Sequence, residues 1–273
     1  MRILSLFLLM LLSVSAFCQK SLEKKLSDAT HVVIADSFNI KILSGKSNHI
    51  KVTGDDYSLK NFVIKQKKGY LYLYQTDKVM MTINGEAQPT QEINFSEIVL
   101  TLNQKVENIS VSNTSKIDFQ DEFSTRRLIL KASDNSQIHG KFSCDAFGLF
   151  LSGGAEGYVS GKFRTAKVIA DSSKAAASEI QVENSEFQVS GGSLVSVKGK
   201  TVNMKLTVKG LSRFEALQFN TQNTLADISG NSDVFFNCSN SLTINAKERS
   251  HIVTTGNPKI NKNVTKDCKF GRR

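Results

Sequence analysis

Apolar and polar residues alternate with a period of two along the C-terminal two thirds of the chain, in segments that end at Ser- and Gly-rich turns. This alternation predicts β-strands with one buried face. Two apolar columns precede the turns: Val111, Ala132, Leu151, Ala170, Val189, Val208, Ile228 and Ala246, and, two residues earlier, Ile109, Leu130, Leu149, Val168, Phe187, Leu206, Ala226 and Ile244. A weaker inward column is expected after the turns, at Ile117, Ile138, Gly157, Ala176, Val195, Phe214, Val234 and Ile252.

The turns recur every 18 to 21 residues, which makes them an internal repeat. They are Ser112–Ser115, Ser133–Ser136, Ser152–Ala155, Asp171–Lys174, Ser190–Ser193, Lys209–Ser212, Ser229–Ser232 and Lys247–Ser250. Coils of this length can stack with like side chains over like, about 4.8 Å apart. We therefore expect a parallel β-helix of about eight rungs over residues 106–256, with the turn serines hydrogen-bonded from coil to coil.

Residues 19–105 have a different pattern, with short alternating strands separated by turn signals. The segment Lys67-Lys68-Gly69 before Tyr70–Tyr74 predicts a β-hairpin. This region is expected to be antiparallel and β-sandwich-like. The fold class predicted for the whole chain is therefore all-β.

The first 18 residues are expected to be a secretory signal peptide. An apolar run from Ile3 to Leu12 follows Arg2, is too short to span a bilayer, and leads to small residues. Cleavage after Cys18 fits this layout, and the alternative is a lipoprotein that carries lipid on Cys18. No second apolar stretch of spanning length follows. The expected location is the periplasm, the outer cell surface or the medium.

Lysine and arginine exceed aspartate and glutamate by 35 to 25, a formal net charge of +10. This excess favours an acidic partner, such as an acidic polysaccharide, and another envelope or surface protein is the alternative. A basic motif interleaved with aromatic residues is absent from the sequence, so nucleic acid is not expected. Residues 257–273 form a basic tail, and Pro258 is expected to end the coil stack.

No arrangement of residues in the sequence indicates catalysis or a cofactor. The four histidines lack metal-ligand spacing, and neither CxxC, GxSxG nor a phosphate-binding glycine loop is present. We therefore expect a non-catalytic protein without cofactor or metal. The alternative is a polysaccharide lyase or hydrolase that uses Glu215 and Asp233. Cys144 and Cys238 are too many coils apart to pair, whereas Cys238 with Cys268 is left open.

A candidate binding patch comes from apolar residues at outward positions. Phe150 and Ile169 are expected to be adjacent on an outside face, with Ile129 and Leu225 in the next column and Tyr158 after a turn. Exposed apolar patches of this kind mark partner sites. Coverage by the N-terminal region or by a loop is the alternative.

Several of these motifs together resemble a known family. They are Phe38-Asn39-Ile40-Lys41-Ile42, the Gly69 hairpin, the Ser-Gly-x-Ser turns, and Ser229–Ser232 leading to Gly256-Asn257-Pro258-Lys259. The chain resembles the bacterial DUF2807 family, named for the head GIN domain of auto-transporter adhesins, over about residues 32 to 265. The resemblance implies a right-handed parallel β-helix, export from the bacterial cytoplasm, and no catalytic residues. An adhesin-like or glycan-binding module is the function expected.

Overall fold

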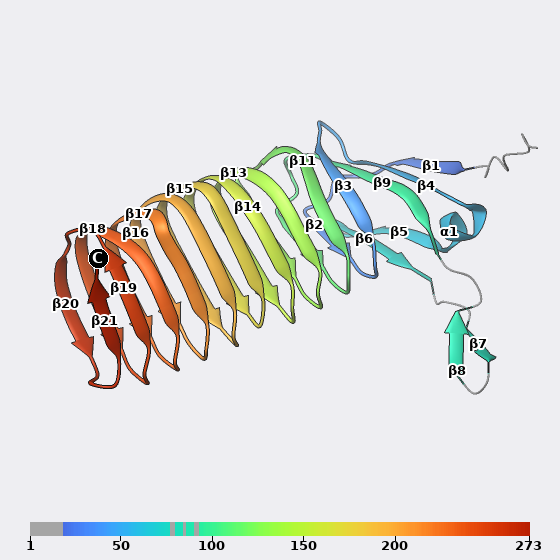
Figure 1. Cartoon of the computed structure of the whole chain (residues 1–273). Coiled ribbons are helices and arrows are strands. Elements are labelled where there is room, and N and C mark those ends of the chain that lie inside the picture. Colours follow the sequence, from blue (N-terminus) through green and yellow to red (C-terminus); the bar gives the residue numbers. More distant parts are fainter. Residues whose placement is uncertain (1–18, 77–79, 84–85, 90–92) are drawn as a thin grey trace, which may run out of the picture.

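The computed structural model describes residues 19–76, 80–83, 86–89 and 93–273. The expected signal peptide lies outside these ranges. The described chain is almost entirely β-structure, arranged as an elongated rod (Figure 1). Its single short helix among these residues, α1 (Asp56–Asn61), begins at Asp55, whose side chain accepts a hydrogen bond from the backbone N–H of Ser58.

The rod is a β-solenoid of about 9 turns, which confirms the predicted repeat. Its strands are β10 (Asn108–Val111), β11 (Lys116–Ser124), β12 (Arg127–Ala132), β13 (Gln137–Ser152), β14 (Glu156–Asp171), β15 (Lys174–Ser190), β16 (Leu194–Val208), β17 (Arg213–Ile228) and β18 (Asp233–Ala246). Neighbouring coils pair in parallel. Leu130, Leu149 and Val168 lie in register and are at most 5% exposed. Stacked apolar columns therefore form the core.

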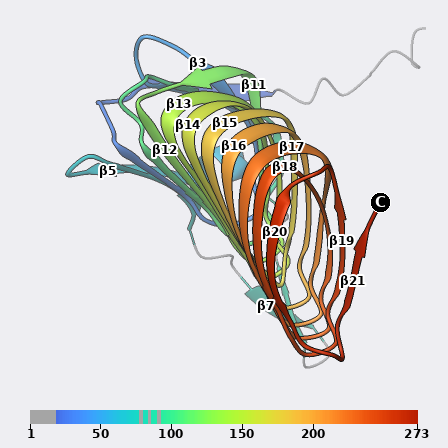
Figure 2. The same cartoon turned by 90° about the vertical axis from the view of Figure 1, so that its left-hand side faces the viewer.

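Each coil is flattened and has two unlike edges (Figures 1 and 2). Tight turns form one edge, which we call the turn edge, and the long strands curve over the other, which we call the bend edge. Pairing registers shift near the bend, for example between Ser160 and Lys162. Gly161 sits there with a φ of 144°, and an added Cβ would lie 1.8 Å from the carbonyl oxygen of Phe142. Close stacking at the bend therefore requires glycine at this position.

Left-handed backbone marks the turn edge, in keeping with the Gly, Asn and Asp residues at most of its turns. The second turn residues all have positive φ, including Ser172 and Glu248, which are not Gly, Asn or Asp; the others are Asn113, Asp134, Gly153, Gly191, Gly210 and Gly230. The register shows that the turn beginning at Asp171 is one residue shorter than expected and ends at Ser173, not at Lys174. Ser173 is buried at the serine position, so Ala175 faces inward and Ala176 outward.

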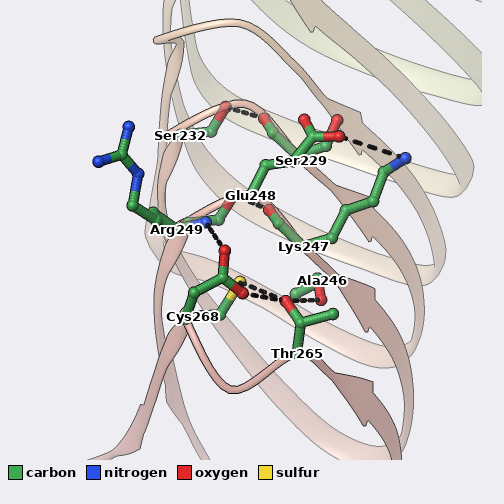
Figure 3. A network of polar contacts seen from close by, with 10 residues as sticks. Ser229, Ser232, Ala246, Lys247, Glu248, Arg249, Thr265 and Cys268 are labelled. Carbon is green, nitrogen blue, oxygen red and sulfur yellow. Dashed lines mark hydrogen bonds and ion pairs between the residues drawn. The ribbon is translucent and has the colours of Figure 1, made fainter.

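The turn serines are buried, and half of the six expected to link coils do so. The hydroxyl oxygens of Ser115 and Ser193 accept from the backbone N–H groups of Phe38 and Ser173 in the preceding coil, each at 3.1 Å. Ser193, Ser212, Ser232 and Ser250 each donate to the carbonyl three residues earlier in their own turn, at 2.5, 2.6, 2.7 and 2.9 Å. Figure 3 shows this bond between Ser232 and Ser229. Ser136 instead donates to the carbonyl of Val111 in the preceding coil, at 3.3 Å. The buried hydroxyls thus satisfy carbonyls within the turns at Ser193, Ser212, Ser232 and Ser250, and bond to the preceding coil at Ser115, Ser136 and Ser193.

The N-terminal strands belong to the same 19-stranded sheet. They are β1 (Lys20–Lys25), β2 (His31–Ile34), β3 (Asn39–Ser44), β4 (His49–Gly54), β5 (Phe62–Lys67), β6 (Tyr70–Gln75) and β9 (Phe95–Leu102). The pairs β1–β4, β4–β9 and β5–β6 are antiparallel. By contrast, β2 and β3 pair in parallel with β10 and β11. Parallel pairing thus begins before residue 106, within the region expected to be antiparallel. A separate hairpin, β7 (Met80–Ile83) with β8 (Glu86–Pro89), projects from this end.

The expectation that Pro258 ends the stack is wrong. After β19 (His251–Thr255), strands β20 (Lys259–Val264) and β21 (Lys269–Arg272) pair in parallel with β18 and β19. Pro258 lies between strands, just before β20, where no ladder N–H is required. The basic tail is therefore a further coil, held at its turn by the Asp267 carboxylate, which accepts from the N–H of Arg249 at 3.0 Å (Figure 3).

Candidate binding surfaces

A groove with a volume of about 1010 Å³ runs along the bend edge. We call it the bend-edge groove. It crosses successive coils from the β11–β12 connection to β18. Each of these coils contributes two or three residues of its bend to the groove lining. Its outward residues include Arg126, Lys162, Arg164, Gln181, Lys200, Asn220, Gln222 and Asn237.

The bend-edge groove carries exposed cations that lack ion-pair partners. Arg126, Lys162, Arg164 and Lys200 line it, and none of them has a carboxylate within 4.0 Å among the described residues. Lys162 pairs in register with Gln181, which pairs with Lys200. The two lysines therefore lie two coils apart in one column, roughly 10 Å along the rod. Asp145 and Glu183 are the acidic residues of the groove.

Amide side chains form a ladder beside this groove. The Asn203 amide donates to Asn184 at 2.8 Å, and the Asn223 amide donates to Asn203 at 3.0 Å. The next coil adds Asn240, which donates to Asn223 at 2.8 Å. Asn184, Asn203 and Asn223 line a second hollow of about 660 Å³. The bend edge thus presents a regular row of hydrogen-bonding groups.

The three described cysteines are free, and Cys238 and Cys268 are not bonded to each other. Cys144 lines the bend-edge groove and Cys238 is buried. Burial raises the pKa of the Cys144 thiol to about 12. The thiol is therefore protonated at neutral pH and contributes no negative charge to the groove.

The structure brings together three of the five residues of the predicted apolar patch and places the other two, Tyr158 and Leu225, elsewhere. Phe150 and Ile169 are in register on one outer face, half-buried, and line a hollow of about 420 Å³. Ile129 lies beside them, because Phe150 and Ile129 flank the same glycine, Gly148. Tyr158 follows a turn and therefore belongs to the opposite face. Leu225, at 43% exposure, shares the column of Ile129 but lies five coils away.

Polar side chains on the face after the turns satisfy one another. Arg213 contacts Glu215 at 2.5 Å and Asp233 at 3.9 Å, and its guanidinium lies 5.0 Å from the centre of the Phe235 ring. His251 completes this row with Asp233, at 3.4 Å. The two acids of the lyase or hydrolase alternative thus share one arginine on the surface of the sheet. In the part of the chain that the structure describes, no group of three His, Cys, Asp or Glu side chains could hold a metal ion.

A second row on this face surrounds His139. The Tyr158 hydroxyl donates to Glu156 at 2.8 Å, and Lys174 contacts the same carboxylate at 3.2 Å. These two contacts lower the pKa of Glu156. The His139 ring packs edge-on against Tyr158, and its Nε2 atom is buried without a hydrogen-bond partner. Burial, followed by the charge of Lys116, lowers the pKa of His139 below its usual value of 6.5, against the opposing effects of Asp118 and Glu156.

This shift predicts a stability loss at mildly acidic pH. The unfolded chain binds a proton on His139 near pH 6.5, whereas the folded chain resists it until lower pH. Unfolding should therefore become easier as the pH falls through this window. When the pH falls from about one unit above 6.5 to about one unit below it, the urea midpoint of the His139→Gln variant should fall less than that of the parent chain. Equal losses in both proteins would contradict this role.

The sequence analysis missed the bend-edge groove, although part of its signal was present. Lys162, Gln181 and Lys200 recur every 19 residues, but the expected columns stopped near the turns, and the spacing changes to 20 and 17 at Asn220 and Asn237. Asn184, Asn203 and Asn223 nevertheless recur at spacings of 19 and 20 residues. A recurring amide away from the turns could have indicated the ladder.

The fold and its surfaces define a class of protein: a β-solenoid whose outer grooves cross successive coils. The chain belongs to the DUF2807 family, described as "Putative auto-transporter adhesin, head GIN domain", whose model matches residues 29–198 and 178–258. This confirms the resemblance seen in the sequence. Among the described residues, no helix is long and apolar enough to cross a membrane.

Solved structures share the architecture at low sequence identity. A protein of Parabacteroides distasonis described as a "putative lipid binding protein" is 16% identical, with a TM-score of 0.64 over 93% of this chain and 96% of its own. A "putative adhesin" of the same species is 10% identical, with a TM-score of 0.65 over 94% and 98%. A "putative adhesin" of Parabacteroides merdae is 12% identical, with a TM-score of 0.61 over 93% and 96%. No curated protein matches the chain. At these identities the likeness is one of fold.

Proposed function

We propose that this protein is an exported, non-catalytic adhesin-like protein that binds acidic polysaccharide along the bend-edge groove. The observation that carries the proposal is a hollow of about 1010 Å³ that crosses successive coils and holds four exposed cations, none of which has an ion-pair partner among the residues the structure describes. Membership of a family described by adhesins supports the adhesin-like role. Export to the envelope or surface follows from the same role.

The shape of the groove favours a linear polymer over a small ligand. Its lining repeats at each coil, about 4.8 Å apart, which is comparable with the length of one sugar unit. Lys162 and Lys200, two coils apart, can each meet a carboxylate or sulfate along such a chain, while Gln181 between them offers an amide to sugar hydroxyls. The asparagine ladder extends this hydrogen-bonding row.

The surface favours binding over catalysis. A hydrolase or lyase needs an acid and a base that converge on one bond of the substrate. Glu215 and Asp233 instead contact Arg213, at 2.5 and 3.9 Å, on an outer strand face. In the bend-edge groove, Asp145 and Glu183 lie two coils apart in one column, with Arg164 in the coil between them.

The proposal is tested by retention of the mature protein on alginate, an acidic polymer, with neutral dextran as the comparison. The Lys162→Glu/Lys200→Glu variant should bind alginate at least about tenfold more weakly, because two attractive contacts become repulsive. The matched control, Lys209→Glu/Lys266→Glu, makes the same charge change at the turn edge and should retain binding. Equal losses in both variants would overturn the groove as the site. Shortened or unsaturated alginate products would overturn the non-catalytic role.

A further inference from the structure

A second surface, distinct from the bend-edge groove, extends over the N-terminal half of the rod on the strands that precede the turns. Two columns run in register across β5, β6, β2, β10, β12, β13 and β14. One contains Lys65, Tyr72, Val33, Ser110, Lys131, Phe150 and Ile169, and the other contains Lys67, Tyr70, His31, Asn108, Ile129, Gly148 and Lys167. We call these two columns the tyrosine–lysine face. It spans six strand spacings, roughly 29 Å.

Aromatic and aliphatic side chains give this face its apolar character. His31 stacks on Tyr70 with ring centres 4.3 Å apart, and Tyr70 stacks on Tyr72 at 5.7 Å. Tyr70 is 37% exposed, and neither tyrosine hydroxyl has a hydrogen-bond partner within the described ranges. Phe150 and Ile169 continue the apolar surface around their hollow of about 420 Å³.

Cations are interspersed with these apolar groups. Lys65, Lys67 and Lys131 are exposed and have no ion-pair partner in the described chain, whereas Lys167 contacts Glu186 at 3.4 Å. No acidic residue belongs to either column on these seven strands, and the second column reaches Glu186 only on β15, where this acid pairs with Lys167. The face therefore attracts an anionic surface and repels a second copy of itself.

The combination of tyrosine and lysine distinguishes between three possible partners of this face: a protein, a sugar and a bilayer. Protein interfaces are enriched in tyrosine but depleted in lysine. A sugar ring requires a free aromatic face, and the stacking of His31, Tyr70 and Tyr72 covers most of the ring faces. At a bilayer surface, by contrast, tyrosines lie at the headgroup level and lysines contact anionic lipids. The regular coils also make the face broad and continuous enough for a planar partner.

We propose that the tyrosine–lysine face docks on the headgroup region of a bilayer that contains anionic phospholipid. The lysines meet phosphate groups, the tyrosine hydroxyls hydrogen-bond at the headgroup level, and Phe150 with Ile169 contacts the acyl boundary. The rod would then lie along the membrane. The bend-edge groove occupies an edge of the coil and not this face, so it remains open to polysaccharide.

The test is flotation of the mature protein with vesicles of phosphatidylcholine alone, or with phosphatidylglycerol in equal parts. Binding should require phosphatidylglycerol and weaken with salt. The Lys65→Glu/Lys67→Glu variant should bind at least about tenfold more weakly, and Tyr70→Ser/Tyr72→Ser, which keeps every charge, should also bind more weakly. The Lys209→Glu/Lys266→Glu control and the groove variant Lys162→Glu/Lys200→Glu should bind as the parent does. Far-ultraviolet circular dichroism and urea midpoints confirm that each variant is folded.

Four outcomes would overturn this proposal: absence of binding by the parent chain, an equal loss in the control, a loss confined to the groove variant, or full binding by the tyrosine variant. Loss of alginate retention in Lys65→Glu/Lys67→Glu without loss of vesicle binding would assign this face to polysaccharide instead. Because the residues differ, failure here leaves the groove proposal standing, and the converse also holds.

Discussion

Replacing Gly161 with alanine is expected to lower the free energy of unfolding by about 4 kcal/mol. The new Cβ would lie 1.8 Å from the carbonyl oxygen of Phe142 in the neighbouring coil, which is backbone and cannot rotate away. The φ of 144° is also rarely adopted by residues with side chains. Both effects force β13 and β14 apart at the bend. Chemical denaturation followed by circular dichroism measures the loss.

Two other glycines separate the steric clash from the conformational cost. Gly192 also has a positive φ, of 75°, but no atom lies within 4 Å of its built Cβ, so Gly192→Ala should cost only about 1 kcal/mol. Gly271 has neither feature, and its replacement should be close to neutral. If Gly161→Ala is no worse than Gly192→Ala, the tight approach of coils at the bend is not present in solution.

Truncating Leu149 to alanine is expected to cost about 3 kcal/mol. Leu149 is fully buried, and its Cδ2 atom lies 3.0 Å from the position that a Cβ on Gly157 would take. Glycine at this inward position thus makes room for the leucine. By itself, Gly157→Ala should cost about 1 kcal/mol through overpacking against Leu149 and Leu151.

The two substitutions together should cost less than their sum. With Leu149 shortened, the new methyl group at residue 157 fills part of the vacated space, and we expect a coupling energy of about 1 kcal/mol. Urea denaturation of the four proteins measures it. Leu225→Ala, at a side chain 43% exposed, serves as the control and should change stability by less than about 0.5 kcal/mol. Strict additivity would show that Leu149 and Gly157 do not share one packing site.

The coil stack could be predicted because two independent signals agree. The period of the turns sets the length of a coil, and the apolar columns before the turns set the register, as Leu130, Leu149 and Val168 show. Positive φ was predictable at Gly and Asn positions, and the fold also imposes it on Ser172 and Glu248. There the hydrogen bonds of neighbouring turns outweigh local preference.

The bend edge and both ends of the rod could not be predicted in the same way. Lys162, Gln181 and Lys200 recur every 19 residues, but the later coils differ in the number of residues at the bend, so Asn220 and Asn237 in the same column do not keep this offset from the turns. The last turn, Thr265–Cys268, lacks the Ser and Gly pattern and is held by side-chain contacts of Thr265 and Asp267. Such contacts depend on tertiary placement and leave no periodic trace.

The final coil leaves the two ends of the rod unlike each other. Antiparallel strands close the N-terminal end, whereas the outer edge of β20 and β21 is unpaired among the described strands. Lys262 and Arg272 there occupy columns that Ile244 and Thr254 fill in the preceding coil. A pulling force on the C-terminal end would therefore detach one coil at a time, releasing about 60 Å of chain per coil. Tension on an anchored molecule would shorten the rod stepwise from that end while the remaining coils stay intact.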